Sequence, residues 1–219
     1  MKLILSVVTL TVLGLFAGPS NADVRLFSDS YKIGIVANQP LGKKHTPNFR
    51  RFKAERSYFG AFFVDTTADV SYWVNNFHDM KKAKRAAHKG CDLLSKDTAH
   101  SIHGPSKCRL YAVSYPKEVD PNGRNLSGMG RWALRVFNDT YKARRTAQGY
   151  GAFALSNASH FGYTYGWNDS EEAKDQALAH CAAAVAKEMA GLTKEGRRWA
   201  HANGLNKCRI VDTQQPDPN

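Results

Sequence analysis

Apolar residues form two pairs of short runs along the chain, and polar turn-forming residues separate the members of each pair. The first pair covers residues 58–64 and 70–74, and the second covers 150–155 and 161–167. Short runs that are rich in aromatic and β-branched residues predict strands, and the Asp, Asn, Ser and Thr residues between them predict turns. Gly60 and Gly151 lie inside these runs and indicate a bulge or a close approach of two backbones. Each half of the chain is therefore expected to open with a β-hairpin.

A helical stripe follows each hairpin. It begins after Asp79 or Asp169, where a side chain can cap a helix, and Glu172 completes a capping-box pattern in the second copy. Mostly small apolar residues then recur at helical spacing on one face: Ala83, Ala87, Cys91 and Leu94 in the first stripe, and Ala173, Ala177, Cys181 and Val185 in the second. We expect these faces to lie against the sheets, with Cys91 and Cys181 pointing inward.

A third apolar run closes each half, at residues 108–114 and 208–213. The order strand, strand, helix, strand predicts an α+β fold of two ββαβ modules, each a small antiparallel sheet packed by one helix. The sequences also match: Phe59-Gly60-Ala61-Phe62 corresponds to Tyr150-Gly151-Ala152-Phe153, and Lys107-Cys108-Arg109 corresponds to Lys207-Cys208-Arg209. The chain is therefore interpreted as a tandem repeat.

The repeat divides the chain into six expected segments. They are a signal peptide at 1–22, a basic N-terminal extension at 23–57, module one at 58–116, a connecting segment at 117–148, module two at 149–216 and a tail at 217–219. The connecting segment has helical spacing from Met129 to Thr140, with Trp132 on the same face, so we do not expect a flexible linker. The extension has only a short apolar patch at residues 33–36, and part of it is expected to be disordered.

Residues 1–22 have the composition of a secretory leader. Lys2 precedes an apolar run at residues 3–16, and the small residues Ser20 and Ala22 occupy the −3 and −1 positions of a cleavage site. The run is shorter than the roughly 20 residues that a spanning helix needs, so cleavage after Ala22 is favoured over an uncleaved anchor. We expect a secreted or periplasmic protein with no transmembrane segment after cleavage.

Four cysteines, two in each module, permit three disulfide connectivities. The symmetry of the repeat favours Cys91 with Cys108 and Cys181 with Cys208, and export favours their oxidation. In a chain-entropy model each bridge contributes on the order of 3 kcal/mol, a large share of the stability of a small module. The alternative is a cysteine-based metal site helped by His100 and His103. Module two has no matching pair of histidines, so we expect no metal and no cofactor.

Four motifs occur together in module two. They are an aromatic-Gly-Ala-Phe strand, Tyr163-x-Tyr165-Gly166-Trp167, Glu172-Ala173-Lys174-x-x-Ala177-Leu178-x-x-Cys181 and a Lys-Cys-Arg-Ile-Val strand. Together they resemble a family of small secreted bacterial domains of unknown function. The resemblance implies an extracytoplasmic, cysteine-bridged module with no established catalytic residue and no activity to carry over. Module one lacks the Tyr-Gly-Trp, and the usual member has one module, so the duplication departs from the family pattern.

The chain is basic, with 31 Lys and Arg against 19 Asp and Glu and a net charge of +12, and most of the excess lies before Lys117. We expect a basic face there to bind an anionic surface or an acidic protein partner, because opposite charges steer association. The expected binding residues are Lys81, Lys82, Lys84, Arg85 and Lys89 on the first helix, and Arg50, Arg51 and Lys53 in the extension. The alternative is a solvated surface with no specific partner. Nucleic acid is disfavoured because the chain is exported and lacks a recognised binding motif.

No motif for a catalytic centre rises above background, so a non-enzymatic binding protein is favoured over an enzyme, and we assign no catalytic residue. An inhibitor or immunity-type protein against a toxin or a host enzyme is the second hypothesis. A hydrolase or nuclease that uses His78, His100 or His103 is the third.

The aromatic residues of the hairpins form either a core or an exposed platform for a sugar or a peptide. They are Tyr72, Trp73, Tyr163, Tyr165 and Trp167. Placement in the core is favoured, because such residues usually cover the core of a small module.

Overall fold

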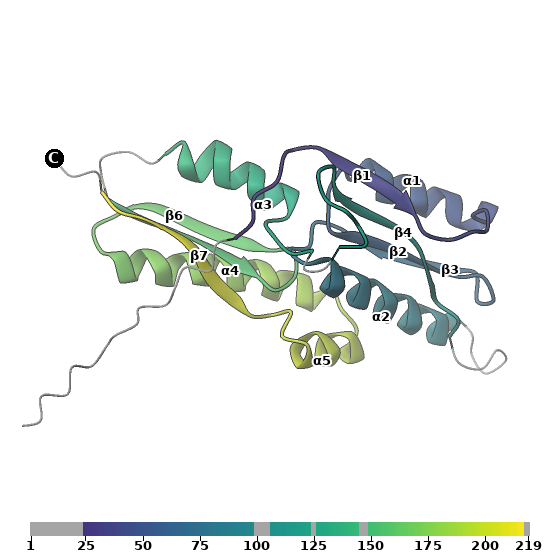
Figure 1. Ribbon diagram of the computed structural model, residues 1–219. Helices are drawn as coiled ribbons and strands as arrows, with labels where there is room; N and C mark the ends of the chain where they lie inside the picture. The colour runs from purple at the N-terminus through teal and green to yellow at the C-terminus, as the bar shows by residue number, and fades with distance from the viewer. Residues whose placement is uncertain (1–23, 99–105, 124–125, 145–148, 217–219) are drawn as a thin grey trace, which may run out of the picture.

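The computed structural model describes residues 24–98, 106–123, 126–144 and 149–216. Its first β-sheet has four antiparallel strands in the order β1-β4-β2-β3. These strands are β1 (Tyr31–Ile35), β2 (Gly60–Asp65), β3 (Val70–Val74) and β4 (Arg109–Pro116). The short helix η1 (Lys43–His45) and helix α1 (Thr46–Ala54) lie on one face of the sheet, and α2 (Met80–Thr98) lies on the other (Figure 1).

Alternation along β2 explains why helices cover both faces of the first sheet. Phe62 clusters with Phe52 of α1, whereas Phe63 clusters with Ala87 and Cys91 of α2. Successive side chains of a strand point to opposite faces, and β2 lies between two neighbouring strands. Every residue of β2 is therefore buried. This explains why its sequence is a nearly continuous apolar run and does not alternate between apolar and polar residues.

The second sheet has three antiparallel strands in the order β6-β5-β7. Its strands are β5 (Tyr150–Ser156), β6 (Phe161–Trp167) and β7 (Cys208–Gln214). Helix α4 (Ser170–Ala190) covers one face, and α5 (Lys194–Ala202) follows it before β7. Helix α3 (Arg131–Val136) continues into the π-helical turn η2 (Phe137–Lys142), whose Phe137 ring meets Phe153 of β5 edge to face at 5.1 Å. In Figure 1, α1 and α3 lie on one side of the two sheets and α2 and α4 on the other.

Small residues let α4 lie close to its sheet. Ala152 and Ala154 of β5 cluster with Ala173 and Ala177 of α4. Gly162 of β6 has no room for a side chain, because a Cβ atom there would lie 2.3 Å from the backbone of α4. The alanine stripe thus serves close packing of helix and sheet.

Both sheets contain the predicted ββαβ order, which confirms the α+β fold of two modules. Module one is β2, β3, α2 and β4, and module two is β5, β6, α4 and β7. The pairing of the first and last strands shifts register once in each module, between Phe62 and Phe63 and between Phe153 and Ala154. The predicted helix caps are also present: Asp79 accepts a hydrogen bond from the Lys82 backbone N–H, and Asp169 accepts two in α4.

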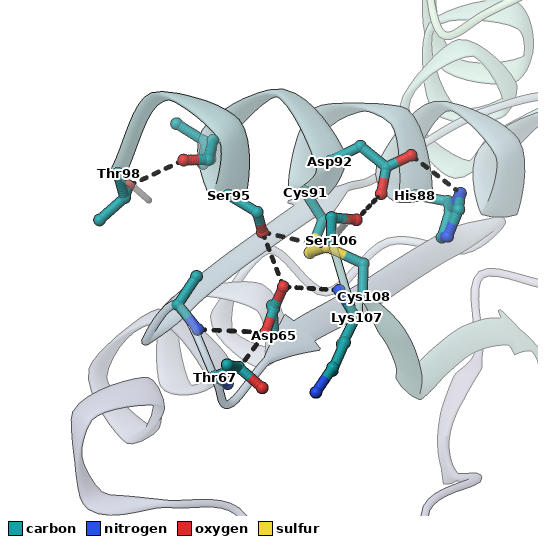
Figure 2. The surroundings of a disulfide bond; sticks show 12 residues. Asp65, Thr67, His88, Cys91, Asp92, Ser95, Thr98, Ser106, Lys107 and Cys108 are labelled. Carbon is teal, nitrogen blue, oxygen red and sulfur yellow. Dashed lines mark hydrogen bonds and ion pairs between the residues drawn. A yellow bond between two sulfur atoms is a disulfide. The ribbon is translucent and has the colours of Figure 1, made fainter. Parts of the chain in front are cut away.

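Disulfides join Cys91 to Cys108 and Cys181 to Cys208, as predicted. In module one, the Asp65 carboxylate holds the neighbouring segments together (Figure 2). It accepts hydrogen bonds from the backbone of Thr67 (2.9 Å), the hydroxyl of Ser95 (3.1 Å) and the backbone of Lys107 (2.8 Å). Burial alone would raise the pKa of Asp65, but these hydrogen bonds outweigh it and hold the pKa below its ordinary value. One carboxylate thus ties the hairpin turn, α2 and the start of β4 together.

Three local expectations are corrected. The extension is not disordered where the structure describes it: β1 pairs with β4, and α1 packs Phe52 onto the sheet. On α2 the buried fourth position of the stripe is Ser95, while Leu94 is 39% exposed, because Ser95 continues the i, i+4 spacing of the buried face. Trp132 is 48% exposed although its helical neighbour Ala133 is buried.

The two modules share one hydrophobic core. Module one contributes Phe59, Phe77 and Met80, the connecting segment contributes Met129, Leu134 and Phe137, and module two contributes Phe153, Leu155 and Val211. A common core of this kind fixes the modules against each other, so the chain is more than two domains on a linker.

Candidate functional site

The predicted basic residues do not form one face. Arg50, Arg51 and Lys53 belong to α1, whereas the other five belong to α2. The two helices pack on opposite faces of the first sheet (Figure 1). A single flat anionic surface therefore cannot contact both clusters at once through these faces.

Three cations of α2 are engaged within the protein. Lys82 Nζ donates to Asn157 Oδ1 (2.8 Å), Arg85 donates to the side chain of Asn203, and Lys89 forms an ion pair with Glu195 (2.6 Å). All three partners belong to the second half of the chain. Much of the predicted basic face is therefore turned toward module two. Lys81, in contrast, is exposed, and Lys84 is half-buried.

His78 connects the two halves through its backbone and its ring. Its backbone N–H donates to Ala158 O (2.9 Å), and its Nδ1 accepts from the Gly130 N–H (2.8 Å). Because Nδ1 is an acceptor, Nε2 carries the hydrogen and donates to His160 O (3.2 Å). A Cβ atom on Gly130 would lie 3.0 Å from His78 Nδ1 and closer still to two backbone oxygens, so glycine is required at this contact.

The His78 ring is a structural connector. Burial lowers its pKa to about 4, although the hydrogen bond to His160 raises it, and the positive charges of Arg209 and Lys82 lower it further. The ring is therefore neutral at neutral pH, and both nitrogens are already bonded. It is not a free general base. His100 and His103, the other histidines considered for a hydrolase, lie outside the described residues.

A pocket of about 480 Å³ opens beside His78, between the two modules. Its walls come from the N-terminal segment, the beginning of α2, the connecting segment, the end of β5 and the beginning of β7. The polar residues in these walls include Arg25, Asp79, Lys82, Ser127, Asn157 and Arg209. Segments that are far apart in the sequence thus meet at one concave site.

Positive charge dominates this pocket. It contains the cations of Arg25, Lys82 and Arg209, and Asp79 is the only carboxylate among the described residues that line it. One oxygen of Asp79 caps α2 by accepting from the Lys82 N–H (2.7 Å). With His78 neutral, the pocket has a net positive charge.

The three cations are held in different ways. Asn157 fixes Lys82 and itself donates to Gly204 O (2.9 Å). The guanidinium of Arg25 lies 5.1 Å from the centre of the Phe27 ring. Arg209 is exposed at the start of β7, opposite Leu155 in the register, and its guanidinium has no hydrogen bond or ion pair with another described residue. Arg209 is thus available to a ligand.

Nearby charges affect the pKa of Lys82. Burial lowers its pKa, Asp79 raises it, and the nearby Arg209 lowers it again. A bound anion would relieve this repulsion and raise the pKa of Lys82. The electrostatics of the pocket therefore favour an anionic occupant.

Two of the three cations were missed by charge patterning along the sequence. Arg25 is isolated from the basic runs, and Arg209 stands out only as part of the repeated Lys-Cys-Arg pattern, which was interpreted as a structural motif. Lys82 was predicted, as one member of a helix face. Only the tertiary structure brings these three residues together.

The aromatic residues of the hairpins mostly contact the cores. Trp73, Tyr72, Trp167 and Tyr163 each pack against a buried cluster. Tyr165 is 38% exposed, and the Arg144 guanidinium lies over its ring at 5.0 Å. Four of these five aromatic residues therefore contact a core, as favoured from the sequence.

All four cysteines are bonded in pairs, so none offers a thiolate to a metal. Among the described residues, no group of three or more His, Cys, Asp or Glu side chains is placed to hold a metal ion. No helix in the described parts of the chain is long and apolar enough to cross a membrane. Comparison of the sequence and the fold with protein-family models, curated proteins and solved structures finds no match.

Proposed function

We propose that the protein is an exported, non-enzymatic binding protein, and that the cationic pocket between its modules holds the anionic group of a ligand. The observation that carries the proposal is the convergence of Arg25, Lys82 and Arg209 from three separate segments into one concavity. Placing like charges together is unfavourable unless an opposite charge joins them. The pocket thus has the chemistry of an anion site.

Donor geometry supports this ligand class. Arginine presents a planar set of N–H donors that matches carboxylate, sulfate or phosphate oxygens, and such charge-assisted hydrogen bonds are stronger than neutral ones. The Arg209 guanidinium is exposed toward the site, while Lys82 is already oriented by Asn157. An anion between Arg209 and Lys82 would be held by a mobile donor and a positioned one.

The size of the pocket indicates more than a bare ion. A water molecule takes about 30 Å³ in the liquid, so a volume of about 480 Å³ greatly exceeds a single phosphate or sulfate ion. Ser127 and Asn157 provide neutral polar groups in the wall. We infer an anionic group attached to a larger polar body.

This proposal moves the expected binding site from a helix face to a pocket. Lys82 belongs to both, but Arg85 and Lys89 are occupied by Asn203 and Glu195. The cations of α1 lie on the far face of the first sheet and form a separate surface.

Export is part of the same proposal. The expected signal peptide at 1–22 lies outside the described residues. Two disulfides support folding in an oxidising compartment, since such bonds are rare in the cytosol.

A thermal unfolding titration with pyrophosphate at low ionic strength tests the binding proposal. A ligand that binds only the folded state raises the melting temperature in a saturable way. The effect is expected for the wild-type protein and to be much reduced in Arg209→Gln and Arg25→Gln. Arg198→Gln removes an equal charge from an exposed position on α5 and is expected to respond like wild type.

The comparison of variants decides the outcome. If Arg198→Gln loses the pyrophosphate effect as much as Arg209→Gln does, overall charge explains it and the pocket does not. Matched sodium chloride additions separate specific binding from general screening. A response that disappears in Arg50→Gln instead would transfer the site to α1.

A further inference from the structure

A second cavity, of about 310 Å³, lies between α2 and the corner of α4 and α5. Its wall is mostly apolar, in contrast to the cationic pocket. The apolar side chains that form it include Tyr72, Leu93, Val185, Met189, Leu192 and Trp199. A mainly apolar concavity of this volume is at the lower end of the range for small-molecule sites.

Local contacts hold the walls in place. The Tyr72 ring lies on Gly90 of α2, where an added Cβ would be 2.2 Å from the ring. The corner between α4 and α5 is fixed by Arg197, which donates to Leu192 O (2.5 Å), and by Thr193, whose hydroxyl accepts from the Gly196 N–H (3.1 Å). The cavity is thus formed before any ligand binds, which lowers the ordering cost of binding.

One residue that lines the cavity has a buried polar atom without a partner. His160 lines the cavity, and its Nδ1 is buried without a hydrogen bond to any described residue. Burial lowers the pKa of His160, although Glu188 raises it, so the ring is neutral at neutral pH. Such a nitrogen can accept or donate one hydrogen bond. A buried polar atom without a partner is unfavourable, and a ligand group that bonds to it removes that penalty.

Lys89, which lines this cavity together with the charged residues Asp97 and Glu188, is paired within the protein. Lys89 lines the wall and reaches across from α2 to Glu195 of α5 (2.6 Å). The ion pair leaves no uncompensated charge at Lys89 for a charged ligand. The cavity therefore differs in ligand chemistry from the cationic pocket.

We propose that this cavity binds an uncharged, largely apolar small molecule that carries one hydrogen-bonding group. The polar group bonds to His160 Nδ1 once the imidazole turns this buried atom toward the cavity, and the apolar body lies among Leu93, Met189 and Trp199. The site does not depend on the anion pocket, and either one can exist without the other.

Fluorescence titration with N-phenyl-1-naphthylamine tests the site, because this probe is uncharged, aromatic and has one N–H group. Ala86 lines the cavity and Ala179 is exposed on α4, so Ala86→Trp and Ala179→Trp form a matched pair. We expect saturable binding to wild type and to Ala179→Trp, and at least about tenfold weaker binding to Ala86→Trp, since tryptophan fills the cavity. Circular dichroism checks that both variants are folded.

Competition by two ligands of similar shape tests the role of His160 and does not require Ala86→Trp to fold. In wild type, 2-naphthol is expected to displace the probe at a free concentration roughly fivefold lower than naphthalene, as one net hydrogen bond provides. In His160→Leu the two competitors should become equivalent. Equal competition in wild type, or equal probe binding by folded Ala86→Trp and Ala179→Trp, would overturn the proposal.

Discussion

Acidification should destabilise the protein through His78 before the carboxylates begin to titrate. The folded state holds the pKa of this ring at about 4, against an ordinary value of 6.5. Above about pH 6.5 the ring is neutral in both states. Between about 6.5 and 4 the unfolded chain binds a proton that the folded chain excludes, so stability falls as the pH falls. Below about pH 4 both states are protonated and the loss stops growing.

The magnitude follows from the size of the shift. Each pKa unit corresponds to about 1.4 kcal/mol, so a shift from 6.5 to about 4 removes roughly 3 kcal/mol from the free energy of unfolding. Small domains are stable by only about 5–15 kcal/mol, so the loss is a large fraction of the total. His160 titrates in the same direction, because burial lowers its pKa too. A variant at His78 is needed to separate the two.

His78→Gln provides that separation. Glutamine does not titrate in this range, and its amide can still donate and accept a hydrogen bond. Urea denaturation followed by tryptophan fluorescence gives the free energy of unfolding at several pH values. We expect the variant to be less stable than wild type at about pH 7.5, and the difference to narrow by roughly 3 kcal/mol on reaching about pH 4.

The control is His201→Gln, which alters an exposed histidine of α5. The free energy of unfolding of this variant should vary with pH as that of wild type does, because the substitution removes no buried side chain. A constant difference between wild type and His78→Gln across the whole range would refute the assignment of His78 as a buried neutral connector.

Three further changes test packing and bridging. Gly162→Ala should cost about 1–3 kcal/mol, because its Cβ would clash with the α4 backbone, whereas Gly191→Ala, with its nearest atom at 3.5 Å, should be nearly neutral by the same denaturation assay. Replacing both Cys91 and Cys108 by serine opens a loop of sequence separation 17 and should lower the stability by about 3 kcal/mol. Asp65→Asn should destabilise the protein at neutral pH by about 2 kcal/mol. Because the folded pKa of Asp65 is lowered, the advantage of wild type should shrink as the pH falls below about 4. An advantage that stays constant on acidification would contradict this assignment.

Local patterns predicted six of the seven strands that the structure describes, the two long helices and both disulfides. Those features depend on periodicity over a few turns or on the repeat, as with Asp79, Asp169 and the inward Cys91 and Cys181. Helix α1 and strand β1 were not predicted because they are short, with nine and five residues. Their stability comes from the sheet that α1 covers and β1 extends. Ser95 was not predicted to be buried because it is polar, although it lies on the buried face by spacing; its hydroxyl bonds to Asp65, 30 residues away.

The site was less predictable than the fold. A count of charges does not show which charged side chains bond within the molecule. On α2, Lys82, Arg85 and Lys89 all contact residues in the second half of the chain. Arg25 and Arg209 line the same pocket because the N-terminal segment and the start of β7 both lie beside the beginning of α2. Such a convergence depends on how the modules share their core, which no local sequence pattern encodes.

The most direct test of the account is an amide NMR titration of residues 23–219 with pyrophosphate. We expect the largest saturable shift changes at residues that surround the cationic pocket, with Gly128, Asn157 and Arg209 among them. Changes centred on α1, around Arg50 and Arg51, or spread evenly over the basic residues, would contradict the assignment of the pocket between the modules as the anion-binding site.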